Sequence, residues 1–379
     1  MTVHQTLPVG PDPLAGPLPR APESPKGRGL PKGEMREAGG ALAAAVALVL
    51  VVFSIAGEFP PFGLFVCTLL AFLLIYGLLS WRLHGVLQMK SRLGTTYVWV
   101  AGALALVPLA DMTIFIVIRG APVAVSHFPD FLVHDAIGGP TDPVWKLGVG
   151  HAIIGSIEQV GLATIYTVPI SILTATFLTE HSSTFSRVVR TVVDAMIGMP
   201  SIIAGIFVYV WWVEPRHTEG SSGFACSMAL GVLMLPIMIR TAEEVIRVVP
   251  GSLREAGLAL GAPRWRVTLR VVLPTAKSGL ITAVILGVAL GVGETAPALF
   301  TAQGSPRYNY NPFRGAQADL PLQVIENILS SAPNQVREGY GGAFVLVTAV
   351  LLLFTIARIV GGSKPGRRLG RRKKEMEPQ

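Results

Sequence analysis

Charged residues are scarce in this chain. Asp, Glu, Lys and Arg make up 14% of its 379 residues, while 51% are hydrophobic, and the mean hydropathy is +0.56. Soluble domains carry about 25% charged residues, so this composition excludes a soluble protein of this length. The two cysteines, Cys67 and Cys226, belong to no CxxC or Cys/His cluster, so neither a disulfide nor a zinc site is predicted. We predict an integral membrane protein without a metal or other cofactor.

Catalytic motifs are missing as well. The chain has no GxxxxGK[ST] loop that would cradle nucleotide phosphates, no HExxH pair and no GxSxG turn. These absences argue against a P-loop ATPase, a zinc protease and an α/β-hydrolase. We therefore expect no enzyme, and any ATP that drives the protein must be hydrolysed by another polypeptide.

The chain does contain a series of apolar runs of about 20 residues, the length that a helix needs to cross a bilayer. Such runs lie near residues 40–57, 62–81, 97–118, 152–179, 188–212, 223–241, 278–301 and 341–361. The pattern predicts an all-α, polytopic membrane protein with about eight transmembrane helices. The first two runs would form an N-terminal hairpin.

Basic residues gather in alternate loops between these runs. Of the 31 Lys and Arg residues, all but Arg119, Lys146, Arg216, Arg307, Arg314 and Arg337 fall on one side of the predicted membrane. The positive-inside rule makes that side cytoplasmic. An even number of spans then puts both termini in the cytoplasm. The net charge of +8 follows from this topology, without a nucleic-acid partner.

Five segments follow from these patterns. They are a disordered cytoplasmic tail (1–38), an accessory transmembrane hairpin with a cytoplasmic loop (39–96), a transmembrane helix with an extracytoplasmic loop (97–149), a transport core (150–361) and a basic cytoplasmic tail (362–379). The first tail is rich in proline, glycine and polar residues, a composition that cannot bury a core.

A polar, basic segment at 242–277 separates two apolar runs of the core. Ser252 followed by Glu255 matches a capping box, which starts a helix. Gly261 suits the left-handed position that ends one, and Pro263 suits the start of a second helix. A polar helical hairpin between two spans predicts a cytoplasmic protrusion that contacts a partner.

A second motif lies in the run at 278–301, with the sequence GVALGVGETAPALF. Gly287 and Gly291 have GxxxG spacing, which predicts a close helix neighbour. Gly293 and Pro297 predict a break around Glu294, since proline cannot continue a helix. A broken helix and a charge at membrane depth are tolerated where they line a cavity, so Glu294 is a candidate pathway residue. A packing kink is the alternative. Other charges near span ends, Glu158 and Asp194, are predicted to be hydrogen-bonded packing residues.

The loop resembles the EAA loop of ABC-importer permeases. Glu255-Ala256-Gly257 is followed after three residues by Gly261, then by Val271 and Leu273-Pro274, with Gly257 where the family has its second alanine. The resemblance implies a type I ABC-importer permease core. It also implies that a separate ATPase docks on the loop, through Glu255, Ala256, Gly257, Gly261, Arg264, Leu273 and Pro274.

The GETAP segment looks like that of phosphate-transporter permeases of the PstA type, and residues 198–207 (GMPSIIAGIF) are similar to that family's VPSI signature. The resemblance implies a bacterial inner-membrane permease for inorganic phosphate. Its expected partners are a second permease, an ATPase dimer, an extracytoplasmic phosphate-binding protein and membrane lipid. Its expected pathway residues are Glu294, Thr295, Pro297, Pro200 and Ser201. Leu290 stands where the family usually has an arginine.

Several alternatives stay open on the sequence. Leu290 leaves molybdate, sulfate and organic-solute permeases as rivals. An ATPase-independent channel or secondary transporter could use Glu294 as its acid, but it has no use for the loop. The loop alone would also fit a surface hairpin without a partner or, with its arginines, a DNA-binding helix-turn-helix. A glutamate does not attract an anion, so we favour pairing of Glu294 with a cation on the partner subunit.

Overall fold

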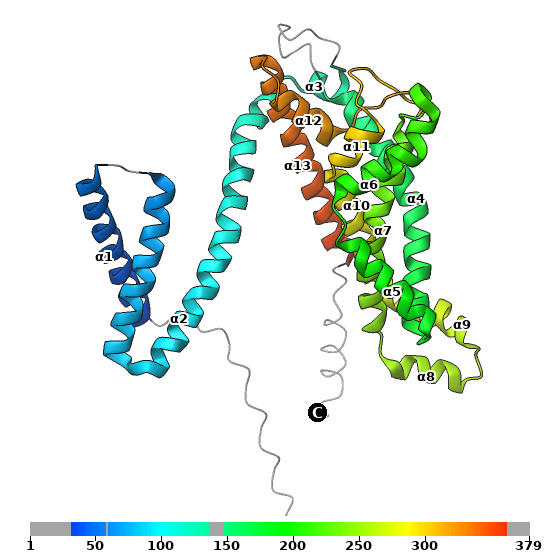
Figure 1. Cartoon of the computed structure of the whole chain (residues 1–379). Coiled ribbons are helices and arrows are strands. Elements are labelled where there is room, and N and C mark those ends of the chain that lie inside the picture. Colours follow the sequence, from blue (N-terminus) through cyan, green and yellow to red (C-terminus); the bar gives the residue numbers. More distant parts are fainter. Residues whose placement is uncertain (1–31, 58–59, 137–147, 362–379) are drawn as a thin grey trace, which may run out of the picture. The chain divides into compact units, whose positions relative to one another are not determined.

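A computed structural model describes residues 32–57, 60–136 and 148–361. Within these ranges the fold is all-α, as predicted, and extended pairing is limited to one isolated bridge between Gln303 and Gln317. In chain order the elements (Figure 1) are α1 (Lys32–Ala56), α2 (Pro61–Ser126), α3 (Asp130–Val133), α4 (Gly150–Glu180), α5 (Thr184–Ile197), α6 (Ser201–Val208), the π-helix η2 (Tyr209–Val213), the 3-10 helix η3 (Glu214–Glu219), α7 (Gly223–Arg247), α8 (Gly251–Ala259), α9 (Arg264–Val267), the π-helix η4 (Thr268–Val272), α10 (Leu273–Gly293), α11 (Ala296–Thr301), α12 (Leu320–Ile328) and α13 (Pro333–Gly361).

The apolar runs fall in helices, with breaks inside the runs at 188–212 and 278–301, and the helix boundaries differ from those of the runs. Among the described residues, six helices are long and apolar enough to cross a membrane, or seven if the bent pair α5–α6 is one span. α2 contains two predicted spans. Its candidate membrane segment, Gly63–Ser126, is 64 residues long, which far exceeds the roughly 20 residues of one crossing. Gly85 interrupts it with a φ of 81°, which glycine adopts without steric cost. Counting α2 as two crossings recovers the eight runs.

The chain splits into two compact units at Pro108 and Leu109, inside the predicted segment 97–149. In the first unit, Arg92 of α2 pairs with Glu34 (3.2 Å) and Glu37 (2.5 Å) of α1. Most of this unit's large apolar side chains are exposed, as suits helices in lipid. α1 begins within the segment predicted as a tail, and the rest of that tail and the tail at 362–379 lie outside the described residues.

The second unit is built around α7. Two thirds of its span are buried, against 28% or less for the other long helices, because α4, α5, α6, α10 and α11 all pack on it. A Cβ atom added at Gly287 would stand 2.5 Å from the Met238 side chain, and one at Gly291 would stand 2.7 Å from Met234 Sδ. The GxxxG spacing therefore brings α10 close to a neighbouring helix, as predicted, and that neighbour is α7.

Glu158 and Asp194, the two acids predicted to be hydrogen-bonded packing residues, both have partners. Glu158 accepts a hydrogen bond from Gln317 Nε2 at 2.5 Å, and the same Gln317 accepts one from Gln159 at 3.2 Å. Asp194 pairs with Arg240 at 2.8 Å. Both acids are thus bonded within the fold, as the sequence predicts.

The two ends of the second unit differ in what they present. α8 and α9 protrude at one end, while α3 and α12 lie at the other, with the long helices between them (Figure 1). At the α12 end, Asp319 caps the helix by accepting a bond from the Leu322 N–H at 2.9 Å. Burial raises the pKa of this carboxyl to about 7. The functional motifs lie elsewhere, in the long helices and at the α8 end.

Candidate functional site: a broken-helix crossing and a protruding loop

The first break separates α5 from α6. The two helices meet at a bend of 103°, and Pro200 precedes the first residue of α6 with an extended ψ of 137°. Proline has no N–H to donate, and its ring clashes with the preceding turn, which favours a break at this point. The segment GMPSI therefore makes a sharp bend between α5 and α6.

The second break separates α10 from α11. α10 ends at Gly293, and Glu294 has an extended backbone with ψ 123°. Thr295 then precedes α11, whose first turn contains Pro297, a position where proline is tolerated. The break that the sequence predicts around Glu294 and Thr295 is confirmed.

The helices that follow the two breaks meet in space. α6 and α11 pack against each other (Figure 1), and Gly205 lies at their contact. A Cβ atom at Gly205 would stand 3.1 Å from Pro297 Cα and 3.3 Å from the Ala296 carbonyl oxygen. Only a glycine permits this approach without displacing backbone. We call residues 201–208 and 296–301 the α6–α11 crossing.

The predicted pathway residues lie at or beside this crossing with different exposure. Pro200 is exposed, Ser201, Glu294 and Thr295 are half-buried, and Pro297 is buried against Gly205. The Glu294 side chain makes no hydrogen bond or ion pair with any residue in the described ranges. A half-buried carboxyl group without a partner in the described fold is available to a group outside this chain.

The loop begins with α8, and its start differs from the prediction. The helix starts at Gly251, directly after Pro250, and no side chain caps it. Ser252 lies inside the helix, whereas an N-cap serine needs an extended backbone to reach the N–H groups of the first turn. The predicted capping box of Ser252 and Glu255 is therefore wrong.

The end of α8 matches the prediction. Gly261 has a φ of 78°, and its N–H donates to the Leu258 carbonyl at 2.9 Å. The Ala262 N–H donates to the Gly257 carbonyl at 3.3 Å. These two bonds form a Schellman motif, which satisfies carbonyls that the helix end leaves open. The turn after α8 is thus set by local bonds and needs no partner to form.

The second half of the loop continues into the membrane helix. Pro263 immediately precedes α9, and α9, η4 and α10 form one helical stretch of 30 residues from Arg264 to Gly293. At 1.5 Å per residue this stretch is about 45 Å long. It ends at the break beside Glu294. The loop and the α6–α11 crossing are therefore joined by one continuous helix.

The loop is anchored at few points and exposes apolar side chains. Arg254 donates to the Ile246 carbonyl at 3.1 Å and pairs with Glu180 at 3.5 Å. α8 has no buried residue, and Leu260 and Trp265 are 88% and 61% exposed. Of the predicted docking residues, Glu255, Ala256, Gly261, Arg264 and Pro274 are exposed, and Gly257 and Leu273 are half-buried. Such a surface is available to a partner.

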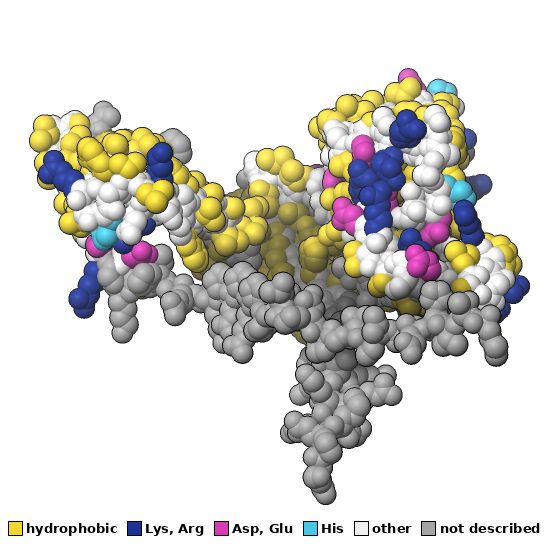
Figure 2. All heavy atoms as spheres, turned by 90° about the horizontal axis from the view of Figure 1, so that it is seen from below, with side chains coloured by type: hydrophobic (Ala, Val, Ile, Leu, Met, Phe, Trp, Pro, Cys, Tyr) yellow, Lys and Arg dark blue, Asp and Glu magenta, His cyan; other side chains and the backbone are white. Residues whose placement is uncertain are grey.

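An ion cluster at the base of the loop was not predicted from the sequence. Glu243 of α7 is 1% exposed and pairs with Arg190 (2.7 Å), Arg240 (2.9 Å) and Arg247 (2.5 Å). Figure 2, seen from the α8 end, shows Lys and Arg side chains gathered over this unit with Asp and Glu among them. The spacing of Arg240, Glu243 and Arg247 was the available signal. Arg190 comes from α5, so the cluster ties α5 to α7.

Known proteins resemble this chain over much of its length. Residues 167–362 match the family described as "Binding-protein-dependent transport system inner membrane component". The phosphate transport system permease protein PstA of Mycobacterium leprae is 36% identical over 264 residues, which cover 69% of this chain and 86% of the relative. PstA of Xylella fastidiosa is 39% identical over 221 residues, or 57% of this chain and 75% of the relative.

Among solved structures, the inward-facing MetNI methionine ABC transporter matches 57% of this chain and 94% of its own, with 21% identity and a TM-score of 0.45. The family match and the relatives agree with the EAA-like loop and the GETAP segment. The chain belongs to the family of binding-protein-dependent transport system inner membrane components.

Proposed function

We propose that this chain is a permease subunit of an ATP-driven importer for inorganic phosphate. One observation carries the proposal: a permease named for phosphate transport aligns over 86% of its own length at 36% identity. The rival oxyanions molybdate and sulfate are tetrahedral like phosphate, but near neutral pH they carry no proton that could donate a hydrogen bond. They are therefore the competitors to include in the test.

The α6–α11 crossing is the proposed wall of the pathway. Glu294, Thr295, Pro200 and Ser201 lie at the two helix breaks, where backbone groups leave the helical ladder, and Pro297 holds the crossing together. Broken helices serve this purpose in other transporters because the freed groups can contact substrate. Glu294 pairs with a cation on a second permease subunit, which keeps its charge from repelling the anion.

The loop is the proposed docking surface for an ATPase dimer. Its exposed leucine and tryptophan side chains suit a hydrophobic cleft, and its Schellman turn keeps them in place before docking. Movement of the docked loop passes along the continuous α9–α10 helix to the break at Glu294. This arrangement favours an ATP-driven permease over a channel or secondary transporter, which would leave the loop unused.

The complete importer, on this proposal, spans the bacterial inner membrane with both termini of this chain in the cytoplasm. A second permease completes the pathway, and an extracytoplasmic binding protein delivers phosphate. The side assignment rests on the 25 of 31 basic residues that share one side of the predicted membrane. ATP is hydrolysed on the ATPase subunits.

The test is uptake of radiolabelled phosphate by cells that lack their own phosphate permease and carry this chain with its partner subunits. We expect phosphate uptake that excess molybdate and sulfate do not inhibit and that stops when the ATPase is inactivated. Glu294→Gln keeps the shape of the side chain but strands the partner's cation, so uptake should fall at least about tenfold while the complex still assembles. Uptake of molybdate or sulfate instead of phosphate would overturn the substrate. ATPase-independent uptake would support the channel or secondary transporter.

A further inference from the structure

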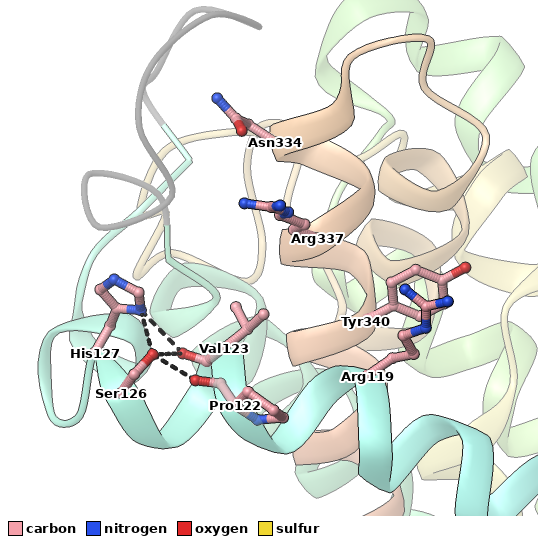
Figure 3. A pocket seen from close by; sticks show the side chains of 8 residues that line it. All are labelled: Arg119, Pro122, Val123, Ser126, His127, Asn334, Arg337 and Tyr340. Carbon is pink, nitrogen blue, oxygen red and sulfur yellow. Dashed lines mark hydrogen bonds between the residues drawn. The ribbon is translucent and has the colours of Figure 1, made fainter.

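A second polar feature of the structure lies away from the crossing and the loop. A pocket of about 560 Å³ opens between the end of α2 and the start of α13 (Figure 3). Its size falls within the range of about 300–1,000 Å³ that is usual for ligand sites. It belongs to the end of the second unit opposite α8 and α9. Neither the proposed pathway nor the docking surface uses it.

The pocket is lined by positive charge. Arg119 of α2 and Arg337 of α13 both face it, and no acidic side chain is among its lining residues in the described ranges. The Arg337 side chain makes no hydrogen bond or ion pair with a described residue, and the Arg119 guanidinium lies 5.8 Å from the centre of the Phe115 ring. Both side chains are exposed, so both guanidinium groups are accessible to an anion in the pocket.

Helix packing sets the positions of the two arginines. A Cβ atom at Gly120 would overlap the Tyr340 carbonyl oxygen and stand 2.7 Å from Phe344 Cβ, so α2 and α13 are in direct backbone contact beside the pocket. The Phe115 ring packs edge-on against the Tyr340 ring at 5.7 Å. The pocket is therefore a product of the fold, because Arg119 and Arg337 are placed by a glycine contact between their helices.

The pocket lies where two candidate spans end. Both helices are candidate spans, and Arg119 lies near the end of one, Gly63–Ser126, while Arg337 lies near the start of the other, Pro333–Ile359. Tyr340 lines the pocket, and aromatic side chains of this kind gather where headgroups meet hydrocarbon. A ligand at this level can come from the lipid or from the water.

We propose that this pocket binds a phosphate group, held by the guanidinium groups of Arg119 and Arg337. The planar guanidinium matches two phosphate oxygens at once, which a lysine cannot do. The phosphate group belongs either to an anionic phospholipid headgroup or to a free phosphate ion, and the depth of the pocket favours the headgroup. The site is independent of the transported substrate, so it stands even if the proposed pathway does not.

The test uses the full-length chain purified in detergent and examined by native mass spectrometry. One arm adds phosphatidylglycerol, and the other adds inorganic phosphate without lipid. The double variant Arg119→Gln/Arg337→Gln should lose affinity roughly tenfold or more in the arm that supplies the true ligand, because both charge-assisted bonds are gone. The double variant Arg119→Lys/Arg337→Lys keeps the positive charge but loses the planar guanidinium group. Its affinity should lie between those of wild type and the double glutamine variant.

Arg314→Gln is the matched control, since Arg314 is an exposed arginine of the loop before α12. Thermal unfolding of each variant shows whether it is folded. Loss in the phosphatidylglycerol arm alone identifies a headgroup, and loss in the phosphate arm alone identifies the free ion. Equal binding of wild type and the double glutamine variant in both arms overturns the proposal. An equal loss in Arg314→Gln does so too, because it would reflect net charge alone.

Discussion

The α6–α11 crossing and the protruding loop formed by α8 and the segment after it (residues 251–274) each contain a glycine with almost the same room beside it. A Cβ atom would stand 3.1 Å from its nearest neighbour at Gly205 and 3.0 Å at Gly257. At Gly205 that neighbour is the backbone of Pro297, inside a packed crossing. At Gly257 it is the end of the Val267 side chain, under a helix that buries no residue. The same distance to the nearest atom therefore does not mean that both positions tolerate an added side chain equally well.

The same difference holds for the two regions as wholes. The crossing depends on helices in close contact at Gly205, and α10, which leads to it, lies close to α7 at Gly287 and Gly291. The loop is held by its Schellman turn, by the pairing of Arg254 with Glu180 and by the contact of Gly257 with Val267. Changes in the crossing should therefore act on folding first, whereas changes in the loop should act on partner binding and leave the membrane core intact.

The largest effect is expected for Gly205→Leu. The added side chain meets backbone that cannot rotate away, and overpacking of this kind costs about 1–3 kcal/mol, or more where nothing yields. The midpoint of thermal unfolding in detergent should fall, and phosphate uptake should be lost with it. Gly205→Ala should show a smaller fall of the same kind. A normal midpoint for Gly205→Leu would mean that α6 and α11 do not cross at this residue.

A smaller effect on stability, with a marked effect on coupling, is expected for Gly261→Val. A β-branched residue at a φ of 78° carries a strain of about 1–3 kcal/mol, which the loop can relieve by losing its turn. We expect normal membrane insertion and a near-normal unfolding midpoint, but much less ATPase recovered when the chain is purified. Gly251→Val is the control, because Gly251 has ordinary helical geometry in the same exposed helix. Equal ATPase recovery for both variants and wild type would remove the docking role.

The smallest effect is expected for Gly257→Ala, which restores the alanine usual in the family. The gain in helix propensity, up to about 1 kcal/mol, opposes the tight contact with Val267, which α8 can relieve by a small outward shift. Stability, ATPase recovery and uptake should all stay near wild type. Comparison with Gly205→Ala in the same assays isolates the difference between a side-chain and a backbone neighbour. A loss as large as that of Gly205→Ala would show that the loop is packed as rigidly as the crossing.

Features that depend on local residue types could be predicted from the sequence. The apolar runs predicted where helices lie, since bilayer thickness fixes their length. The Glu294 break and the Gly261 turn were predicted because proline and glycine act on the backbone locally. The bend at Pro200, inside the predicted run 188–212, was not predicted, although the proline itself was the available signal. The start of α8 was not predicted, because Pro250 and Ser252 offer competing signals two residues apart and the sequence does not rank them.

By itself, the sequence determined the all-α membrane class, the helix break at Glu294 and the exposed turn of the loop. Only the tertiary structure decided that the run at 188–212 bends at Pro200, that the helices following this bend and the Glu294 break cross, that Glu243 pairs with arginines from two helices, and that Arg119 and Arg337 line one pocket. Each of these depends on residues far apart in the chain, brought together by packing around α7 or against α13. Periodicity and motif spacing describe single elements, so they carry no information on which distant elements touch.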